Sequence, residues 1–212
     1  GIAFVTRAPG ATNATSGVYV AAQGETPMIL FVGLPPRALA DMSTFQDFDL
    51  AALFGGMAKR VEIAVSAARL PETVSRAYAL AMSGRPGPVV IGLPEDVLAE
   101  TANVPDAPYI AAARAEPSTA ALRDIAAQIA AAEQPLVIVG GPRWSARAQE
   151  AVQDFAQRFD LPVAAAFRAQ DYVDNRHQSY CGHIGINMDE RLATAIRAAA
   201  LLLVIGAPLD EI

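Results

Sequence analysis

The stretch FVTRAPGATNATSG, residues 4–17, joins an apolar run to a segment of small residues, and this junction decides the fold class. Residues 2–5 are typical of a buried strand, and residues 11–13 have the composition of a helix start behind a Pro-Gly corner at 9–10. Small residues let another group approach the backbone, and a helix N-terminus offers unpaired N–H groups to a polar ligand. On spacing alone the stretch favours a structural turn, because short glycine motifs often occur without a ligand.

Strand-like and helix-like segments alternate along the rest of the chain. Their apolar runs are continuous rather than alternating, which indicates parallel strands that are covered on both faces. The sequence therefore predicts an α/β fold with two mostly parallel-sheet, doubly wound domains. We expect strands at 1–6, 27–34, 59–65, 87–94, 135–141, 161–167 and 200–208, and helices at 11–23, 49–54, 71–84, 118–133, 145–159 and 187–199.

Local signals support the second half of this assignment. Ser118 and Ser145 stand where N-caps are expected, each directly before a helical pattern. Apolar positions such as Ile125 and Ile129 predict core packing for the first of these helices. Residues 168–185 are polar and irregular, so we expect a long loop there.

The composition changes at residues 101–117, which hold three prolines, several alanines and no long apolar run. Such a segment is typical of a linker. We therefore expect one domain at 1–100, a linker at 101–117, and a Rossmann-like domain at 118–212. The chain opens without Met inside a strand pattern and stops shortly after another strand, so we expect a fragment of a longer protein.

Charge and cysteine usage exclude several classes of protein. The formal net charge of the 212 residues is −6, with 16 Lys and Arg against 22 Asp and Glu, so we expect no nucleic-acid partner. A single cysteine, Cys181, cannot form an internal disulfide and fits a reducing compartment. The longest strongly apolar run, 201–205, is too short to span a bilayer. We expect a soluble, cytoplasmic protein without a membrane partner.

Three longer motifs carry a resemblance to a known family. The segment TRAPGATN at 6–13 is similar to the T-x-G-P-G-A-T-N stretch of thiamine diphosphate-dependent enzymes of the acetolactate synthase type. Residues 35–61 resemble the family's R-x(6-7)-F-Q-E stretch and the basic residue after it. The run GRPGPVVIGLPEDV, 84–97, resembles the end of the family's pyrimidine-binding domain and is the most specific of the three. From residue 118 onward the chain is similar to the family's central domain.

The resemblance implies a cofactor site in the first domain. Pro9, Gly10 and Asn13 would lie beside the aminopyrimidine ring of thiamine diphosphate, and Phe45 would form a wall of that site. Gln46 would take the catalytic position, where a neutral amide can hydrogen-bond a carbonyl or hydroxyl without competing for protons. Without the family, the pair at 45–46 reads as an exposed loop with one anchoring aromatic.

The chain also departs from the family pattern. Ala8 replaces the usual glycine before Pro-Gly, and Leu34 stands where a polar glutamine is common. Both changes make the edge of the pocket more apolar or more crowded. They bear on the identity of the substrate more than on binding of the cofactor.

The resemblance implies a transferase or lyase that decarboxylates a 2-oxo acid and transfers the acyl group, working as a homodimer or homotetramer. In the family, the glutamate that activates the cofactor lies upstream of Gly1, and Mg²⁺ is held by a G-D-G…N motif in a third domain. We therefore expect the 212 residues alone to be inactive. The alternatives are a non-catalytic homologue or scaffold that retains the fold, and a complete nucleotide-binding α/β protein.

Other candidate sites are weaker. Cys181, His183 and His177 offer one thiol and two imidazoles on a single expected loop, without the paired spacing of zinc ligands. The aspartates at 171 and 174 read as a solvated loop rather than a metal site. The turn VIVGGPRWSARA, 137–148, lacks the third glycine of a dinucleotide loop. Some family members bind FAD in this domain, but here we favour a structural turn, and we expect no metal ligands in this chain.

Overall fold

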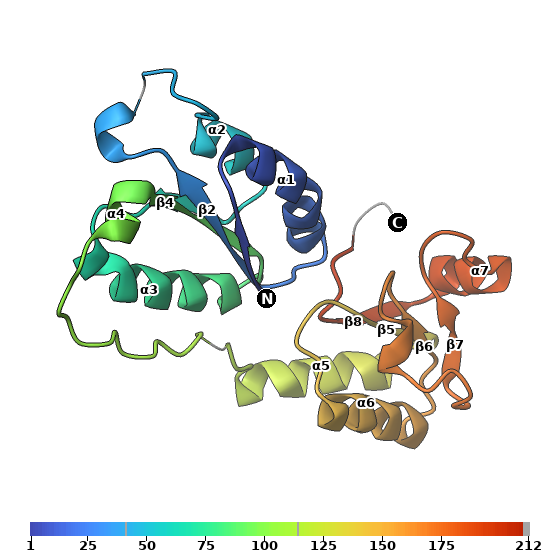
Figure 1. The fold of residues 1–212 in the computed structure, drawn as a ribbon. Helices are drawn as coiled ribbons and strands as arrows, with labels where there is room; N and C mark the ends of the chain where they lie inside the picture. The colour runs from blue at the N-terminus through green and yellow to red at the C-terminus, as the bar shows by residue number, and fades with distance from the viewer. Residues whose placement is uncertain (41, 114, 210–212) are drawn as a thin grey trace. The chain divides into compact units, whose positions relative to one another are not determined.

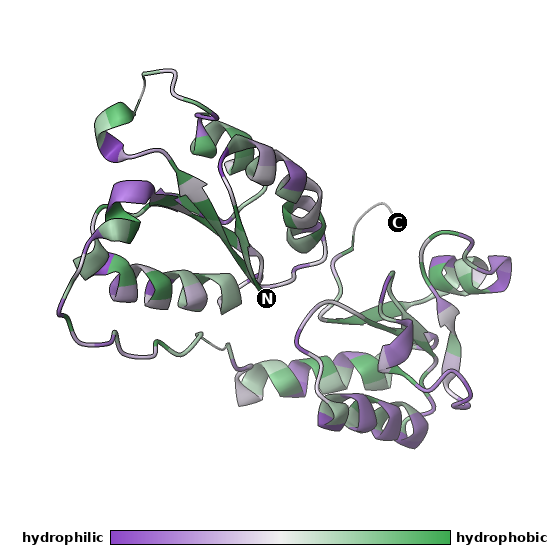
Figure 2. Cartoon of the chain, in the orientation of Figure 1, coloured by the Kyte–Doolittle hydropathy of each residue, from purple (hydrophilic) through white to green (hydrophobic). Residues whose placement is uncertain are grey.

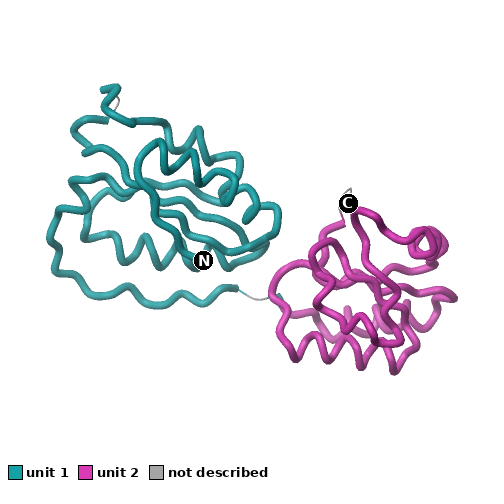
Figure 3. The backbone as a smooth tube through the Cα atoms, turned by 45° about the vertical axis from the view of Figure 1, so that its right-hand side comes forward, with its two compact units in different colours: residues 1–115 teal, residues 116–212 magenta. Residues whose placement is uncertain are grey.

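The computed structural model describes residues 1–40, 42–113 and 115–209. It divides the chain into two compact units, Gly1–Ala115 and Glu116–Ile212, shown in teal and magenta in Figure 3. The division falls inside the segment 101–117, and the described residues of that segment form neither helix nor strand. None of the helices in the described ranges is long and apolar enough to cross a membrane.

Unit 1 is built on a four-stranded parallel sheet with the order β1-β2-β4-β3. Its helices lie on both faces (Figure 1): α1 and α2 pack on one face, and α3 and α4 pack on the other. The strands are β1 (Ile2–Val5), β2 (Met28–Leu34), β3 (Arg60–Ile63) and β4 (Pro88–Pro94), and the helices are α1 (Ala8–Gln23), α2 (Leu50–Phe54), α3 (Leu70–Met82) and α4 (Glu95–Ala99), with short 3-10 turns at Arg37–Leu39 and Ala67–Arg69.

The core of unit 1 follows from the continuous apolar strands. All seven residues of β4 are buried, because β2 and β3 flank it and helices cover both of its faces. Figure 2 shows hydrophobic residues along β2 and β4, the central strands of unit 1, as parallel strands covered on both faces require. The prediction that the strands are parallel is confirmed, since every strand pair in the described residues is parallel. The expected burial of residues 2–5 is wrong, because β1 is an edge strand on which Ile2 is 66% and Phe4 is 70% exposed.

Unit 2 repeats this architecture with a second parallel sheet in the order β7-β6-β5-β8. Helix α6 packs on one face of the sheet and α7 on the other. The strands are β5 (Pro135–Val139), β6 (Val163–Ala165), β7 (Tyr180–His183) and β8 (Leu201–Ile205), and the helices are α5 (Thr119–Ala131), α6 (Ala146–Arg158) and α7 (Glu190–Ala198), with a 3-10 turn at Gln170–Tyr172. Ser118 and Ser145 cap α5 and α6 as predicted, each accepting a backbone N–H three residues on.

Two sequence-based expectations in unit 2 are wrong. The expected loop 168–185 contains β7, which pairs with β6 across an irregular register and includes Gly182. A four-residue strand at the edge of a sheet leaves too little apolar signal to be recognised. Ile125 of α5 is 40% exposed rather than buried, because this face of the helix borders an open cavity instead of the sheet.

Candidate functional site

The carboxyl ends of the unit 1 strands meet at one edge of the sheet. In parallel α/β sheets this edge is where ligands bind, because the connecting loops and helix N-termini gather there. Helix α1 follows β1, the long segment 35–49 follows β2, and α4 follows β4 directly. The residues that the sequence nominated, at 9–13 and 45–46, both lie in these connections.

Helix α1 begins at Ala8, so the expected Pro-Gly corner is in fact its first turn. Proline is tolerated at this position, because an N–H in the first turn has no intrahelical acceptor. A methyl group on Gly10 would lie 3.0 Å from Thr6 Cγ2 and 3.1 Å from Val5 Cβ. The small size of Gly10 is therefore required by the end of β1, while Pro9 and Asn13 are exposed one turn apart.

The structure brings Gln46 to the start of α1. The Ala8 N–H donates to the Gln46 carbonyl over 3.3 Å, although 38 residues separate them. Gln46 is half-buried and has φ +60°, the left-handed region that few non-glycine residues adopt. Phe45, beside it, is 78% exposed and so presents its ring to the surface of this unit. The predicted catalytic and cofactor-side residues thus share one edge of the sheet.

Arg37 anchors the other end of this segment; it opens the family-like motif there, but its partners could not be predicted from the sequence. Its Nε donates to Asp96 Oδ2 at 2.7 Å and its Nη2 to Glu100 Oε1 at 2.6 Å, and its Nη1 also donates to the Val65 carbonyl. The Arg37 backbone N–H and then its guanidinium hold the pKa of Asp96 below the ordinary range. The segment after β2 is thereby tied to α4.

A cavity of about 950 Å³ lies under this segment, at the ends of β2, β3 and β4. Its lining is mixed: apolar strand ends such as Ile63 face polar side chains that include Thr44, Asp47 and Asp49. Asp49 is the N-cap of α2 and accepts the Ala52 N–H. The hydroxyl of Thr44 is buried and, among the described residues, has no hydrogen-bond partner. The sequence offered no signal for Thr44.

The turn after β5 in unit 2 is closely packed against other parts of the same unit. A methyl group on Gly140 would lie 2.7 Å from Ala166 Cβ, and one on Gly141 would collide with the Gly206 carbonyl. Trp144 Nε1 donates to the Gly140 carbonyl at 2.8 Å, and a tyrosine hydroxyl, Tyr172, donates to that of Gly141 at 2.8 Å. Only glycine fits at these positions, because the loops after β5 and β8 pack against each other where the strand order of the sheet reverses.

The remaining polar candidates of unit 2 lie on β7 and in the loop before it. Cys181 and His183 lie on β7, and burial raises the pKa of the Cys181 thiol. Hydrogen bonds from Arg176 hold the pKa of Asp174 below the ordinary range. No group of three or more His, Cys, Asp or Glu residues in the described ranges could hold a metal ion.

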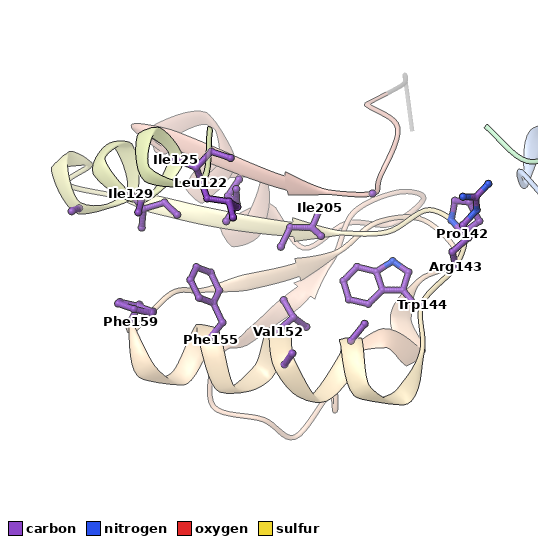
Figure 4. A pocket seen from close by; sticks show the side chains of 16 residues that line it. Leu122, Ile125, Ile129, Pro142, Arg143, Trp144, Val152, Phe155, Phe159 and Ile205 are labelled. Carbon is purple, nitrogen blue, oxygen red and sulfur yellow. The ribbon is translucent and has the colours of Figure 1, made fainter. Parts of the chain in front are cut away.

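Unit 2 also contains an apolar cavity of about 720 Å³ between α5 and α6 (Figure 4). Leu122 and Ile129 from α5 face Phe155 from α6 across it, and Trp144 closes one end. Such walls can bury apolar surface but offer few groups that would orient a ligand. Polar side chains and strand ends converge in unit 1 instead, which makes unit 1 the candidate site.

The nominated side chains of unit 1 are of the types that could contact the aminopyrimidine ring of thiamine diphosphate. Asn13 and Gln46 carry neutral amides, which can pair with the ring nitrogens, amino group or hydroxyls of a heteroaromatic ligand. Phe45 supplies an exposed ring for stacking. Among the described residues, no group of three or more His, Cys, Asp or Glu could hold the metal ion of a diphosphate. The residue types suit the aminopyrimidine end of the cofactor, although the nominated residues do not line the cavity of unit 1.

Comparison with known proteins agrees with this geometry. Residues 1–53 match the N-terminal TPP binding domain of thiamine pyrophosphate enzymes, and residues 122–212 match the central domain of the same enzymes. The acetolactate synthase large subunit of Parasynechococcus marenigrum is 31% identical over 220 residues, covering 100% of this chain and 35% of its own length. The large subunit of acetolactate synthase isozyme 1 of Escherichia coli is 30% identical, covering 96% and 36%.

A solved structure supports the same fold. The thiamine diphosphate-dependent 4-hydroxybenzoylformate decarboxylase of Rhodococcus jostii superposes with a TM-score of 0.85 at 22% identity, over 99% of this chain and 41% of that protein. The chain thus spans roughly a third of the length of the curated relatives it matches. Its motifs, its two parallel sheets and these matches together show that the chain belongs to the thiamine pyrophosphate-dependent enzyme family.

Proposed function

We propose that this chain is the pyrimidine side and part of the central domain of an acetolactate synthase-like carboligase or decarboxylase that acts on a 2-oxo acid. The observation that carries the proposal is the hydrogen bond from the Ala8 N–H to the Gln46 carbonyl. It joins the nominated cofactor-side helix to the nominated catalytic loop. The names of the relatives, acetolactate synthase large subunits, support the reaction class.

Each residue then has a distinct task. Pro9, Gly10 and Asn13 provide the surface against which the aminopyrimidine ring lies, with the Asn13 amide as its polar contact. Phe45 shields one side of the ring from water. Thiamine diphosphate, when bound, supplies the electron sink that decarboxylation of a 2-oxo acid requires. The Gln46 amide donates to a substrate carbonyl or hydroxyl, and it takes no proton because an amide does not titrate.

The proposed site is completed by residues outside this chain. Mg²⁺ would bridge the diphosphate to a further domain, and a second subunit would close the exposed face that carries Phe45 and Asn13, in a homodimer or homotetramer. Stable interfaces of this kind commonly exceed about 2,000 Å². We propose no flavin for unit 2, because its glycine turn is filled by its own side chains.

Two substitutions in the full-length protein test the proposal. Gln46→Ala should lower turnover of pyruvate about five-fold, the value of one neutral hydrogen bond, or change acceptor preference, with cofactor affinity nearly unchanged. Asn13→Leu should weaken cofactor binding by a similar factor. Gln23→Leu, at the exposed far end of the same helix, is the control and should alter neither.

Calorimetric titration with thiamine diphosphate and assay of acetolactate formation separate the two effects. Equal losses of affinity in both variants would contradict the assignment of separate roles. Cofactor binding without turnover in the unmodified full-length protein would favour a non-catalytic homologue instead.

A further inference from the structure

The guanidinium of Arg7 connects three segments at the carboxyl edge of unit 1. Arg7 lies between β1 and α1, and its Nη1 donates to the Phe45 carbonyl at 3.2 Å. Its Nη2 donates to Glu95 Oε2 at 2.7 Å, at the first residue of α4. The Arg7 side chain is only 25% exposed, against 66% for Glu95, so the loop and the helix both cover the arginine.

Two neighbouring residues at the start of α1 donate hydrogen bonds to two consecutive carbonyls of the loop. The Arg7 guanidinium donates to the Phe45 carbonyl, and the backbone N–H of Ala8 donates to the Gln46 carbonyl. Gln46 has the left-handed backbone conformation, φ +60°, which is unfavourable for a non-glycine residue. Such a conformation persists only where surrounding contacts impose it. The Asp47 N–H donates to the Thr44 carbonyl at 3.1 Å and closes a turn around Phe45 and Gln46, and the two hydrogen bonds from Arg7 and Ala8 fasten this turn to the start of α1.

The planar fork of arginine suits this arrangement. One Nη reaches the loop carbonyl while the other keeps its bond to the Glu95 carboxylate, so the carboxylate fixes the plane in which the first Nη donates. A lysine ammonium is a point charge and lacks this pre-organised geometry. Arg37 ties the start of the same segment to α4, so Arg7 controls the part of the loop that carries the nominated catalytic amide.

We propose that Arg7, oriented by Glu95, is a positioning residue that fixes the backbone of Phe45 and Gln46 and thereby the direction of the Gln46 side chain. The proposal rests on the function proposed for Gln46. Arg7 itself touches neither substrate nor cofactor in this role.

Hydrogen exchange on the 212-residue chain tests the contact without any assay of activity. Ala8 is the first residue of α1 and has no intrahelical acceptor, so protection of its amide reports the bond to Gln46. Arg7→Ala should lower this protection about five-fold, and Arg7→Lys should restore only part of it. Arg85→Ala breaks a comparable ion pair, with Glu25 at 2.7 Å, and should leave the Ala8 amide unchanged.

A double-mutant cycle in the full-length protein tests the role. Arg7→Ala should lower kcat about five-fold with little change in KM, and should lower it no further when Gln46 is already alanine. Additive losses would overturn the proposal, because Arg7 would then act independently of Gln46. Unchanged protection of the Ala8 amide in Arg7→Ala would overturn it as well. A silent Gln46→Ala variant would refute the proposed function and the catalytic part of this role, while the exchange data would still decide whether Arg7 holds the loop.

Discussion

Two glycines on helix α1 allow a matched test of why the start of this helix is small. A methyl group on Gly10 would lie 3.0 Å from Thr6 Cγ2 and 3.1 Å from Val5 Cβ, whereas one on Gly17 would have no neighbour within 4 Å. Replacing an exposed helical glycine by alanine stabilises a helix by about 0.8–1 kcal/mol. Crowding a packed contact costs about 1–3 kcal/mol. We therefore expect Gly17→Ala to stabilise unit 1 and Gly10→Ala to be less stable than Gly17→Ala by about 1–3 kcal/mol.

Urea denaturation can measure this difference with an internal reference. The only tryptophan, Trp144, lies in unit 2, so its fluorescence follows that unit, while far-UV circular dichroism follows both. The substitutions should shift the dichroism transition and leave the tryptophan transition in place. If Gly10→Ala stabilises the chain as much as Gly17→Ala, the end of β1 does not crowd the helix. The small residue would then need another cause, such as close approach of a ligand.

Three further predictions concern charge, flavin and the segment between the units. Arg37 lowers the folded-state pKa of Asp96, so this pair stabilises unit 1 above about pH 4, and the contribution is lost as the pH falls toward the lowered pKa; Asp96→Asn should remove that part of an acid denaturation profile. FAD should show no saturable quenching of its fluorescence on titration with the chain, since the Trp144 and Tyr172 side chains lie against the turn after β5; saturable binding would refute the structural assignment of that turn. Brief subtilisin digestion should cut first within 101–117, and mass spectrometry of a first cut inside β4 or β5 would contradict this.

The fold could be predicted because burial on both faces leaves a strong signal in the sequence. Strand β4 is apolar at nearly every position, and it lies at the centre of its sheet. The signal fails where burial is partial. Strand β7 is short and half-exposed, and α4 is a single turn directly after β4, so neither could be recognised. Helix α1 begins three residues earlier than expected because proline fits its first turn.

The candidate site was predictable only as a set of residue types. The sequence placed Gln46 in a loop, but its left-handed backbone and its contact with Ala8 depend on β1 and β2 being neighbours in the sheet. Arg37 opens the second of the three family-like motifs, but nothing local to it or to Arg7 indicates partners that lie 59 and 88 residues away. Contacts over such separations are set by topology, which periodicity does not encode.

The glycine after β1 and the glycines after β5 show how topology determines which ligand the end of a strand can bind. Both follow a strand and open a helix, the arrangement that usually binds phosphate. After β5, however, the glycine carbonyls accept from aromatic side chains of the same unit. After β1, the first helix amide donates to the Gln46 carbonyl, and the adjacent Arg7 guanidinium is already paired with the Glu95 carboxylate, so the pair carries no net charge. The N-terminus of α1 therefore contributes little electrostatic attraction to a bound anion, whereas binding of a neutral ring does not depend on such attraction. Unit 1 is therefore suited to the uncharged end of the cofactor, and we expect the diphosphate to be held by residues outside it.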